Sequence, residues 1–235
     1  THYDNSRGYF TGAEDFPGPR TMRAAAKWIR DASPQHRAKD ERFMLFIDEF
    51  DPHEPFDTPE EWAMKYDDTW EGPHLVWPPY AVDAIAQGII NKREAHQIHS
   101  QYGSKLSMID HYLGQVLDAL DETNAWDDTA VVLCTDHGHY LGDSDVHGRD
   151  LWGKPSVPVY KELGNIPMMI YWPGVTPRVC NALTTSTDIH ATIAEVFDAE
   201  VKHRTHGTSL QPLIDASSER IRDWLLTGVW GREVQ

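Results

Sequence analysis

AVVLCTDHG, at residues 130–138, is an apolar run that breaks abruptly into polar residues. The apolar part is too short for a helix, so it predicts a buried strand of a parallel sheet, with Asp136 and His137 on the turn that follows. Upstream, residues 43–47 (FMLFI) predict another buried strand. Between them, residues 92–122 repeat apolar side chains at steps of three and four, which predicts a long helix. A strand, a helix and a strand in this order predict a crossover unit of an α/β fold.

Further elements extend this pattern. Residues 20–31 predict a helix with four apolar residues on its buried face: Met22, Ala25, Ala26 and Ile29. Residues 167–172 predict a third strand, and Asp188 is expected to cap a helix. Residues 51–80 form a long loop rich in proline and tryptophan, and loops of this length usually serve a function. The sequence therefore predicts one layered α/β domain over residues 1–235, with ligands at the carboxyl ends of its strands.

Charge and composition exclude several classes of function. The chain has 21 basic and 37 acidic residues and a formal net charge of −16, so we do not expect nucleic acid as a partner. Its apolar runs are far shorter than the roughly 20 residues that a membrane span needs. Cys134 and Cys180 are too few for a disulfide framework, and Cys134 is expected to be a buried thiol. No signal peptide follows Thr1, and the sequence leaves the localisation open.

Ionisable residues gather after both predicted strands. Asp136 and His137 could offer an oxygen and a nitrogen to one cation, or Asp136 could cap a turn beside a solvated His137. His53 lies between two prolines, which either pre-set it for proton transfer or only shape the loop. Lys154 could hold an anionic oxygen or simply be solvated. A wider set could form a transition-metal site: Asp136, His137, His139, Asp143, Asp145 and His147.

Aromatic residues follow His53 in the long loop. They are Trp62, Trp70, Trp77 and Tyr80. Their faces could stack on a sugar or aryl ring, or they could cover the edge of the sheet. The net charge of −16 would repel a sulfated polymer at long range, so such a ligand would depend on local positive charge.

Taken in order, several short motifs resemble one family. They are FMLFIDEFDPHEPF (43–56), MID (108–110), DDTAVV (127–132), TDHG (135–138), LWGK (151–154), the stretch from IP to PG (166–174) and HGTSLQPL (206–213). Their number, order and spacing resemble the second half of a sulfatase of the alkaline-phosphatase-like superfamily. The resemblance covers roughly residues 40–213.

This resemblance implies a fold and a chemistry. The fold would be an α/β/α sandwich with a mainly parallel sheet, truncated at its amino-terminal side. Asp136 and His137 would be ligands of a divalent cation, with calcium expected and manganese or zinc as alternatives. Lys154 would contact a sulfuryl oxygen, His53 would lie beside the leaving-group oxygen, and Asp136 could also take a proton from the nucleophile. The implied activity is hydrolysis of a small-molecule or carbohydrate sulfate ester, and the four residues are expected to converge at one end of the sheet.

The chain departs from the family pattern at the nucleophile. The family uses a formylglycine made within a Cys-x-Pro-Ser-Arg-like motif, and neither Cys134 nor Cys180 lies in such a motif. The formylglycine and the remaining metal carboxylates are therefore expected outside this chain. The chain alone is then expected to be inactive and to bind calcium weakly. Two alternatives stay open: a phosphodiesterase or phosphonate monoester hydrolase that uses the same four residues, and a non-catalytic metal-binding or interaction fragment.

Overall fold

The computed structural model describes residues 12–142, 148–154, 159–229 and 233–234. The chain divides into two units, of which the first comprises Thr1–Trp126 with Tyr140–Pro155 and the second comprises Asp127–His139 with Ser156–Gln235. In the part of the chain that the structure describes, every helix is too short or too polar to cross a membrane.

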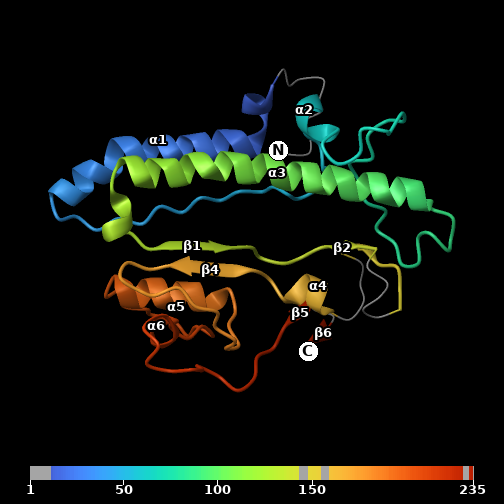
Figure 1. Cartoon of the computed structure of the whole chain (residues 1–235). Helices are drawn as coiled ribbons and strands as arrows, with labels where there is room; N and C mark the ends of the chain where they lie inside the picture. Colours follow the sequence, from blue (N-terminus) through green and yellow to red (C-terminus); the bar gives the residue numbers. More distant parts are fainter. Residues whose placement is uncertain (1–11, 143–147, 155–158, 230–232, 235) are drawn as a thin grey trace. The chain divides into compact units, whose positions relative to one another are not determined.

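Two long helices, α1 (Pro17–Ala38) and α3 (Lys92–Glu122), lie side by side in the first unit (Figure 1). The predicted apolar face of α1 is confirmed as buried. Its four residues are all 6% exposed or less: Met22, Ala25, Ala26 and Ile29. Burial of this face against α3 stabilises a pair of helices that would be marginal alone.

The carboxyl end of α1 lies beyond the predicted end at Asp31, because the helix continues through Pro34. A proline inside a helix removes one backbone hydrogen bond, which is why the sequence favoured an earlier end. In the structure, the Arg37 guanidinium donates to the carbonyl oxygens of Thr123 (2.7 Å) and Asn124 (3.0 Å), just after α3. This contact between the two helix ends stabilises the last turn of α1.

The predicted long helix is confirmed, and its start has a clear local cause. The Asn91 side chain accepts hydrogen bonds from the amides of Arg93 and Glu94 (2.9 and 3.0 Å), and the Glu94 carboxylate accepts one from the Asn91 amide (2.7 Å). This reciprocal capping box satisfies backbone donors that have no partner within the helix.

The strand predicted at residues 43–47 is not formed among the described residues. The exposure of its side chains alternates along the segment, as in an extended chain, but Met44 and Phe46 are 53% and 75% exposed. An extended segment becomes a strand only when a neighbour supplies the ladder of hydrogen bonds. The long loop that follows contains the short helix α2 (Glu60–Ala63).

Short elements complete the first unit. Strands β2 (Tyr140–Leu141) and β3 (Trp152–Gly153) pair antiparallel, and short 3-10 helices occur at η3 (Ala13–Asp15) and η4 (Ala125–Asp127).

The long loop packs on an apolar core of the first unit. The buried residues of this core are Phe56, Ala84, Ala95, Ile98 and Trp152. They join the loop, the start of α3 and β3, so residues far apart in the sequence share one apolar cluster.

The second unit confirms two predicted strands but not their predicted direction. Strands β1 (Val131–Cys134) and β4 (Met168–Tyr171) pair antiparallel. Within the described residues all sheets are two-stranded and antiparallel, so the expected mainly parallel sheet is wrong for this part of the fold. The expected burial of β1 is also wrong, because a two-stranded sheet leaves side chains uncovered, and Cys134 is an exposed free cysteine.

Short elements complete the second unit. They are α4 (Lys161–Gly164), α5 (Thr187–Val196), α6 (Gln211–Ile214), β5 (Gly228–Val229) and β6 (Glu233–Val234). The sequence predicted that Asp188 caps α5, and this is wrong. The cap position is Ser186, and Asp188 lies inside the first turn of the helix.

The Asp188 carboxylate is instead fully buried and holds distant segments together. It accepts hydrogen bonds from the amides of Thr185 and Thr208 (both 2.8 Å) and from the Arg222 guanidinium (2.5 and 2.6 Å). Burial alone would raise the pKa of Asp188, but these hydrogen bonds lower it below its ordinary value. The sequence could not foresee this, because Arg222 is far along the chain.

Candidate functional site

His53 and Lys154 come together although they are 101 residues apart in the sequence. The Lys154 Nζ lies 3.0 Å from the His53 Nε2. The His53 amide donates to the Phe50 carbonyl (3.1 Å), and the two rings stack with centroids 4.3 Å apart. The turn and the stacking therefore fix the direction in which the imidazole points.

Glu54, which the sequence did not predict as a site residue, faces both of these side chains. It is 2% exposed, with Oε1 3.6 Å from the Lys154 Nζ and Oε2 3.2 Å from the His53 Nδ1. The His53 Nδ1 also lies 2.8 Å from the Glu54 carbonyl oxygen. Acceptors at Nδ1 favour a proton on that nitrogen and leave Nε2 to exchange the reactive proton. An acid between the two prolines of DPHEP was the signal that could have identified Glu54.

The backbone before Lys154 requires glycine. Gly153 has φ of +77°, and a Cβ there would lie 2.8 Å from ring atoms of Tyr80. The Tyr80 ring therefore packs directly on Gly153 while remaining 51% exposed. This places an aromatic surface against the residue that precedes Lys154.

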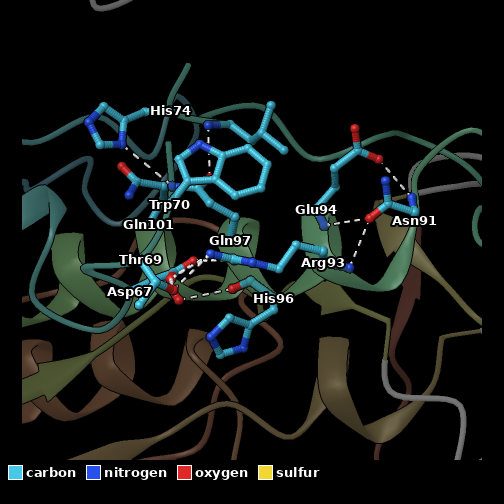
Figure 2. Close-up of polar contacts among 12 residues, drawn as sticks. Asp67, Thr69, Trp70, His74, Asn91, Arg93, Glu94, His96, Gln97 and Gln101 are labelled. Atoms are coloured by element: carbon cyan, nitrogen blue, oxygen red, sulfur yellow. Dashed lines mark hydrogen bonds and ion pairs between the residues drawn. The ribbon is translucent and has the colours of Figure 1, made fainter. Parts of the chain in front are cut away.

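The four aromatic residues of the loop divide into two kinds. Trp70 donates Nε1 to the Pro73 carbonyl (2.9 Å) and lies under the Arg93 guanidinium, 4.8 Å from the ring centroid (Figure 2). Trp62 lies against the His111 ring, with centroids 5.6 Å apart. Trp77 and Tyr80, in contrast, are each about half exposed. The packing role therefore applies to the first two, and a stacking role stays a hypothesis for the last two.

In the second unit, Asp136 and His137 occupy the turn after β1. The Asp136 Oδ1 accepts from the His137 amide (2.8 Å), and the His137 Nδ1 lies 2.8 Å from the Gly138 carbonyl oxygen. The Gly138 amide donates to the Leu163 carbonyl (2.9 Å), and a Cβ at Gly138 would lie 1.8 Å from the Glu162 carbonyl oxygen. Close backbone approach therefore requires glycine immediately after the Asp-His pair.

The turn has the chemistry of two metal donors. Because the His137 Nδ1 faces a carbonyl, its Nε2 is available to a cation, and it lies 3.5 Å from the Asp136 Oδ2. The side chains of Asp136 and His137 are 82% and 41% exposed, so a cation could reach both. Among residues with described positions, no three His, Cys, Asp or Glu side chains are arranged to hold a metal. Two donors fit part of a site, since calcium takes six or more oxygen ligands.

The structure does not test two other predicted features, the wider metal cluster and the convergence of the four site residues. The wider metal cluster includes Asp143, Asp145 and His147, which lie outside the described residues. His53 and Lys154 belong to the first unit and Asp136 and His137 to the second, so their convergence stays a prediction.

Comparisons with known proteins agree with the motifs. A family model described as Sulfatase matches residues 4–199. The chain is 29% identical over 129 residues to a choline-sulfatase from Rhizobium meliloti (strain 1021), covering 54% of this chain and 24% of that protein. It is 26% identical over 185 residues to an arylsulfatase from Clostridium perfringens (strain 13 / Type A), covering 75% of this chain and 35% of that protein.

The fold is similar to that of a solved hydrolase. The structure of a phosphonate monoester hydrolase from Silicibacter pomeroyi matches with a TM-score of 0.65 and 24% identity, over 92% of this chain and 44% of that chain. The chain thus spans less than half the length of each of these three proteins.

Proposed function

Because this chain belongs to the sulfatase family, we propose that it contributes to a catalytic domain that hydrolyses sulfate esters. The observation that supports this most directly is the Lys154–His53 pair, with 3.0 Å between Nζ and Nε2, set beside the buried Glu54. A cation next to a proton-exchanging nitrogen suits an ester whose oxygens are anionic and whose leaving oxygen needs a proton. We further propose that the two units are parts of one domain over residues 1–235.

In the proposed reaction, the Lys154 ammonium turns from the His53 Nε2 to a sulfuryl oxygen, and His53, once protonated at Nε2, donates that proton to the leaving-group oxygen. As an oxygen of the nucleophile bonds to sulfur, the bond between sulfur and the leaving-group oxygen breaks with its electron pair on that oxygen, so the sulfuryl group passes to the nucleophile and the alcohol or phenol leaves neutral. The Glu54 carboxylate, 3.2 Å from Nδ1, stabilises the imidazolium before transfer. The nucleophile, a formylglycine in this family, is proposed to lie outside the chain.

Asp136 and His137 are proposed to hold the divalent cation, with calcium favoured and manganese or zinc as alternatives. When bound, the cation would polarise an oxygen of the sulfate group. The exposed Asp136 carboxylate would in addition accept the proton of the nucleophile. This assignment is supported by the 3.5 Å separation of the two donor atoms.

The proposed substrate is a small-molecule or carbohydrate sulfate ester. Tyr80, half exposed and packed on Gly153, offers a face for the sugar or aryl ring of such an ester. The net charge of −16 disfavours long anionic polymers at a distance.

The test compares rates on matched aryl sulfate, phosphodiester and phosphonate monoester substrates, using the protein as its gene encodes it and added calcium or manganese. We expect the sulfate ester to be hydrolysed fastest, and Lys154→Ala to lower that rate at least about 100-fold. Lys161→Ala, at an exposed lysine, is the matched control. Preference for a phosphorus ester would favour the phosphodiesterase or phosphonate hydrolase alternative. No hydrolysis of any ester with either metal would favour a non-catalytic role.

A further inference from the structure

One face of α3 carries a row of long polar side chains that fasten the loop. Arg93, Gln97, Gln101 and Lys105 are four residues apart, which places them one above another along the helix. We call this row the α3 ladder. Each member reaches a different point of the segment between residues 51 and 75.

The first three members of the ladder hold the outer part of the loop (Figure 2). Arg93 binds the Asp67 carboxylate with two hydrogen bonds (2.5 and 2.8 Å), which hold the pKa of Asp67 below its ordinary value. Gln97 accepts from the Leu75 amide (2.9 Å). The Gln101 Nε2 donates to the carbonyl of Ala63 in α2 (2.8 Å). The ladder thus secures an irregular segment that lacks strands of its own.

Lys105, the last member, reaches the turn that carries His53. Its ammonium donates to the Pro55 carbonyl (2.6 Å) and lies 2.8 Å from the Asp51 Oδ1 and 3.2 Å from the Asp57 Oδ1. Asp51 and Pro55 are each two residues from His53, one on either side. A single ammonium therefore contacts the turn both before and after His53.

Because these charges are buried, water cannot take the place of the Lys105 ammonium. Lys105 is 4% exposed, and the side chains of Asp51 and Asp57 are 5% and 9% exposed. Water can do little to screen the two carboxylates from each other, so loss of the ammonium would leave them buried and repelling. Burial raises the pKa of the nearby Glu49 carboxyl. A hydrogen bond from the Asp51 amide to this carboxylate (3.0 Å) lowers that pKa, whereas the negative charge of Asp51 raises it further.

We propose that Lys105 is a positioning residue that holds the Asp51–Asp57 turn so that the His53 Nε2 meets Lys154 and the leaving-group oxygen. The catalytic part of this inference rests on the proposed function. Lys105 itself acts from beneath the turn, through Asp51, Pro55 and Asp57, without touching the substrate.

The first arm of the test measures proton transfer, with Lys105→Met in the protein as its gene encodes it. A misplaced acid matters most for poor leaving groups, so kcat for phenyl sulfate should fall about 100-fold and kcat for 4-nitrophenyl sulfate only about 5-fold, with KM changed less than about 3-fold. Arg93→Met removes another charged member of the ladder, about 18 Å along α3, and should change neither kcat more than about 3-fold. Equal losses on both substrates, or no loss, would overturn the proposal.

The second arm does not depend on activity. Amide hydrogen exchange reports the turn through the His53 amide, bonded to Phe50, and the Phe56 amide, bonded to the Val76 carbonyl (2.7 Å). Lys105→Met should speed exchange at both amides by about tenfold or more, and Arg93→Met should not. Unchanged exchange would overturn the proposal. If the unmodified protein hydrolyses no sulfate ester, the proposed function fails and this arm alone decides whether Lys105 positions the turn.

A milder variant covers the case in which Lys105→Met does not fold. Asp57→Asn removes the negative charge 3.2 Å from the ammonium, keeps an oxygen that can accept from it, and leaves Asp51 and the Pro55 carbonyl in place. It should shift the same two amides and the same leaving-group dependence in the same direction, by about 3-fold. A folded Asp57→Asn protein with neither shift would count against the proposal.

Discussion

Each unit contains an ion pair with a buried carboxylate, but the two ion pairs hold different parts of the chain. In the first unit, Lys105 binds Asp51 and Asp57 beneath the turn that carries His53. In the second unit, Arg222 binds Asp188 and joins α5 to the segment that follows α6. The exposed turn of the second unit with the proposed metal donors Asp136 and His137 is held by hydrogen bonds to neighbouring backbone atoms instead.

This difference separates two ways of preparing a site. The proposed proton donor, His53, is fixed by the interior of its own unit before any ligand binds. Asp136 is 82% exposed, and its donor atom is oriented but not enclosed, as expected for a ligand whose geometry is completed by the cation itself. Variants on each side of this comparison should therefore affect activity and stability unequally.

The largest expected effect is on activity, from Asp136→Ala. In the protein as its gene encodes it, loss of a proposed metal donor should lower kcat/KM for an aryl sulfate by about 1,000-fold, which corresponds to about 4 kcal/mol of transition-state stabilisation. Because the side chain is exposed, Tm measured without added cation should stay within about 1 °C. Glu200→Ala, at an exposed acid of the same unit, should change neither quantity. Activity within tenfold of the original would contradict the metal-donor role.

Asp188→Asn should have the next largest effect, on stability alone. Breaking a buried ion pair leaves Arg222 uncompensated and should cost about 3 kcal/mol at pH 7, measured by denaturant unfolding. The pKa of Asp188 is lowered in the folded state, so its contribution is complete above about pH 4 and is lost as the pH falls through the folded value.

The difference between the original and Asp188→Asn proteins should therefore shrink below about pH 4. Asp223→Asn is the matched control, because its ion pair with Arg220 is exposed and should contribute less than about 1 kcal/mol. A difference that grows as the pH falls would contradict the sign of the shift.

Glycine substitutions should differ in sign between the two units. Gly138→Ala places a Cβ 1.8 Å from the Glu162 carbonyl and should destabilise the protein by about 2 kcal/mol. Gly114→Ala, within α3, meets no atom within 4 Å and should stabilise it by about 0.5–1 kcal/mol. Thermal unfolding of both variants checks this. Destabilisation by Gly114→Ala would contradict the prediction, because it would mean that another part of the protein contacts this face of α3.

The smallest expected effect is on substrate binding. Tyr80→Ala should raise KM for aryl sulfates about fivefold and leave KM for a short alkyl sulfate nearly unchanged, since ring stacking contributes about 1 kcal/mol. Tyr66→Ala removes a tyrosine of equal exposure that bonds Ser107 (2.6 Å), and it should leave both KM values unchanged. An equal rise for both substrates would remove the stacking role from Tyr80.

Local patterns in the sequence were sufficient for several elements. The start of α3 follows from Asn91 and Glu94, which cap the helix within four residues of each other. The buried face of α1 follows from helical spacing. The end of α1 and the pairing of β1 could not be predicted in this way, because Arg37 and the strand β4 act from distant parts of the sequence.

The candidate site also has features that the sequence predicts and features that depend on tertiary contacts. The sequence by itself determined the family and the four proposed site residues, because motif order and residue chemistry are written along the chain. Only the tertiary structure decided that Lys154 meets His53, that Glu54 faces both and that Lys105 lies beneath the turn. The physical reason is burial: a lysine in a helix is ordinarily solvated, and only packing that removes it from water makes its pairing with Asp51 and Asp57 strong enough to hold a loop.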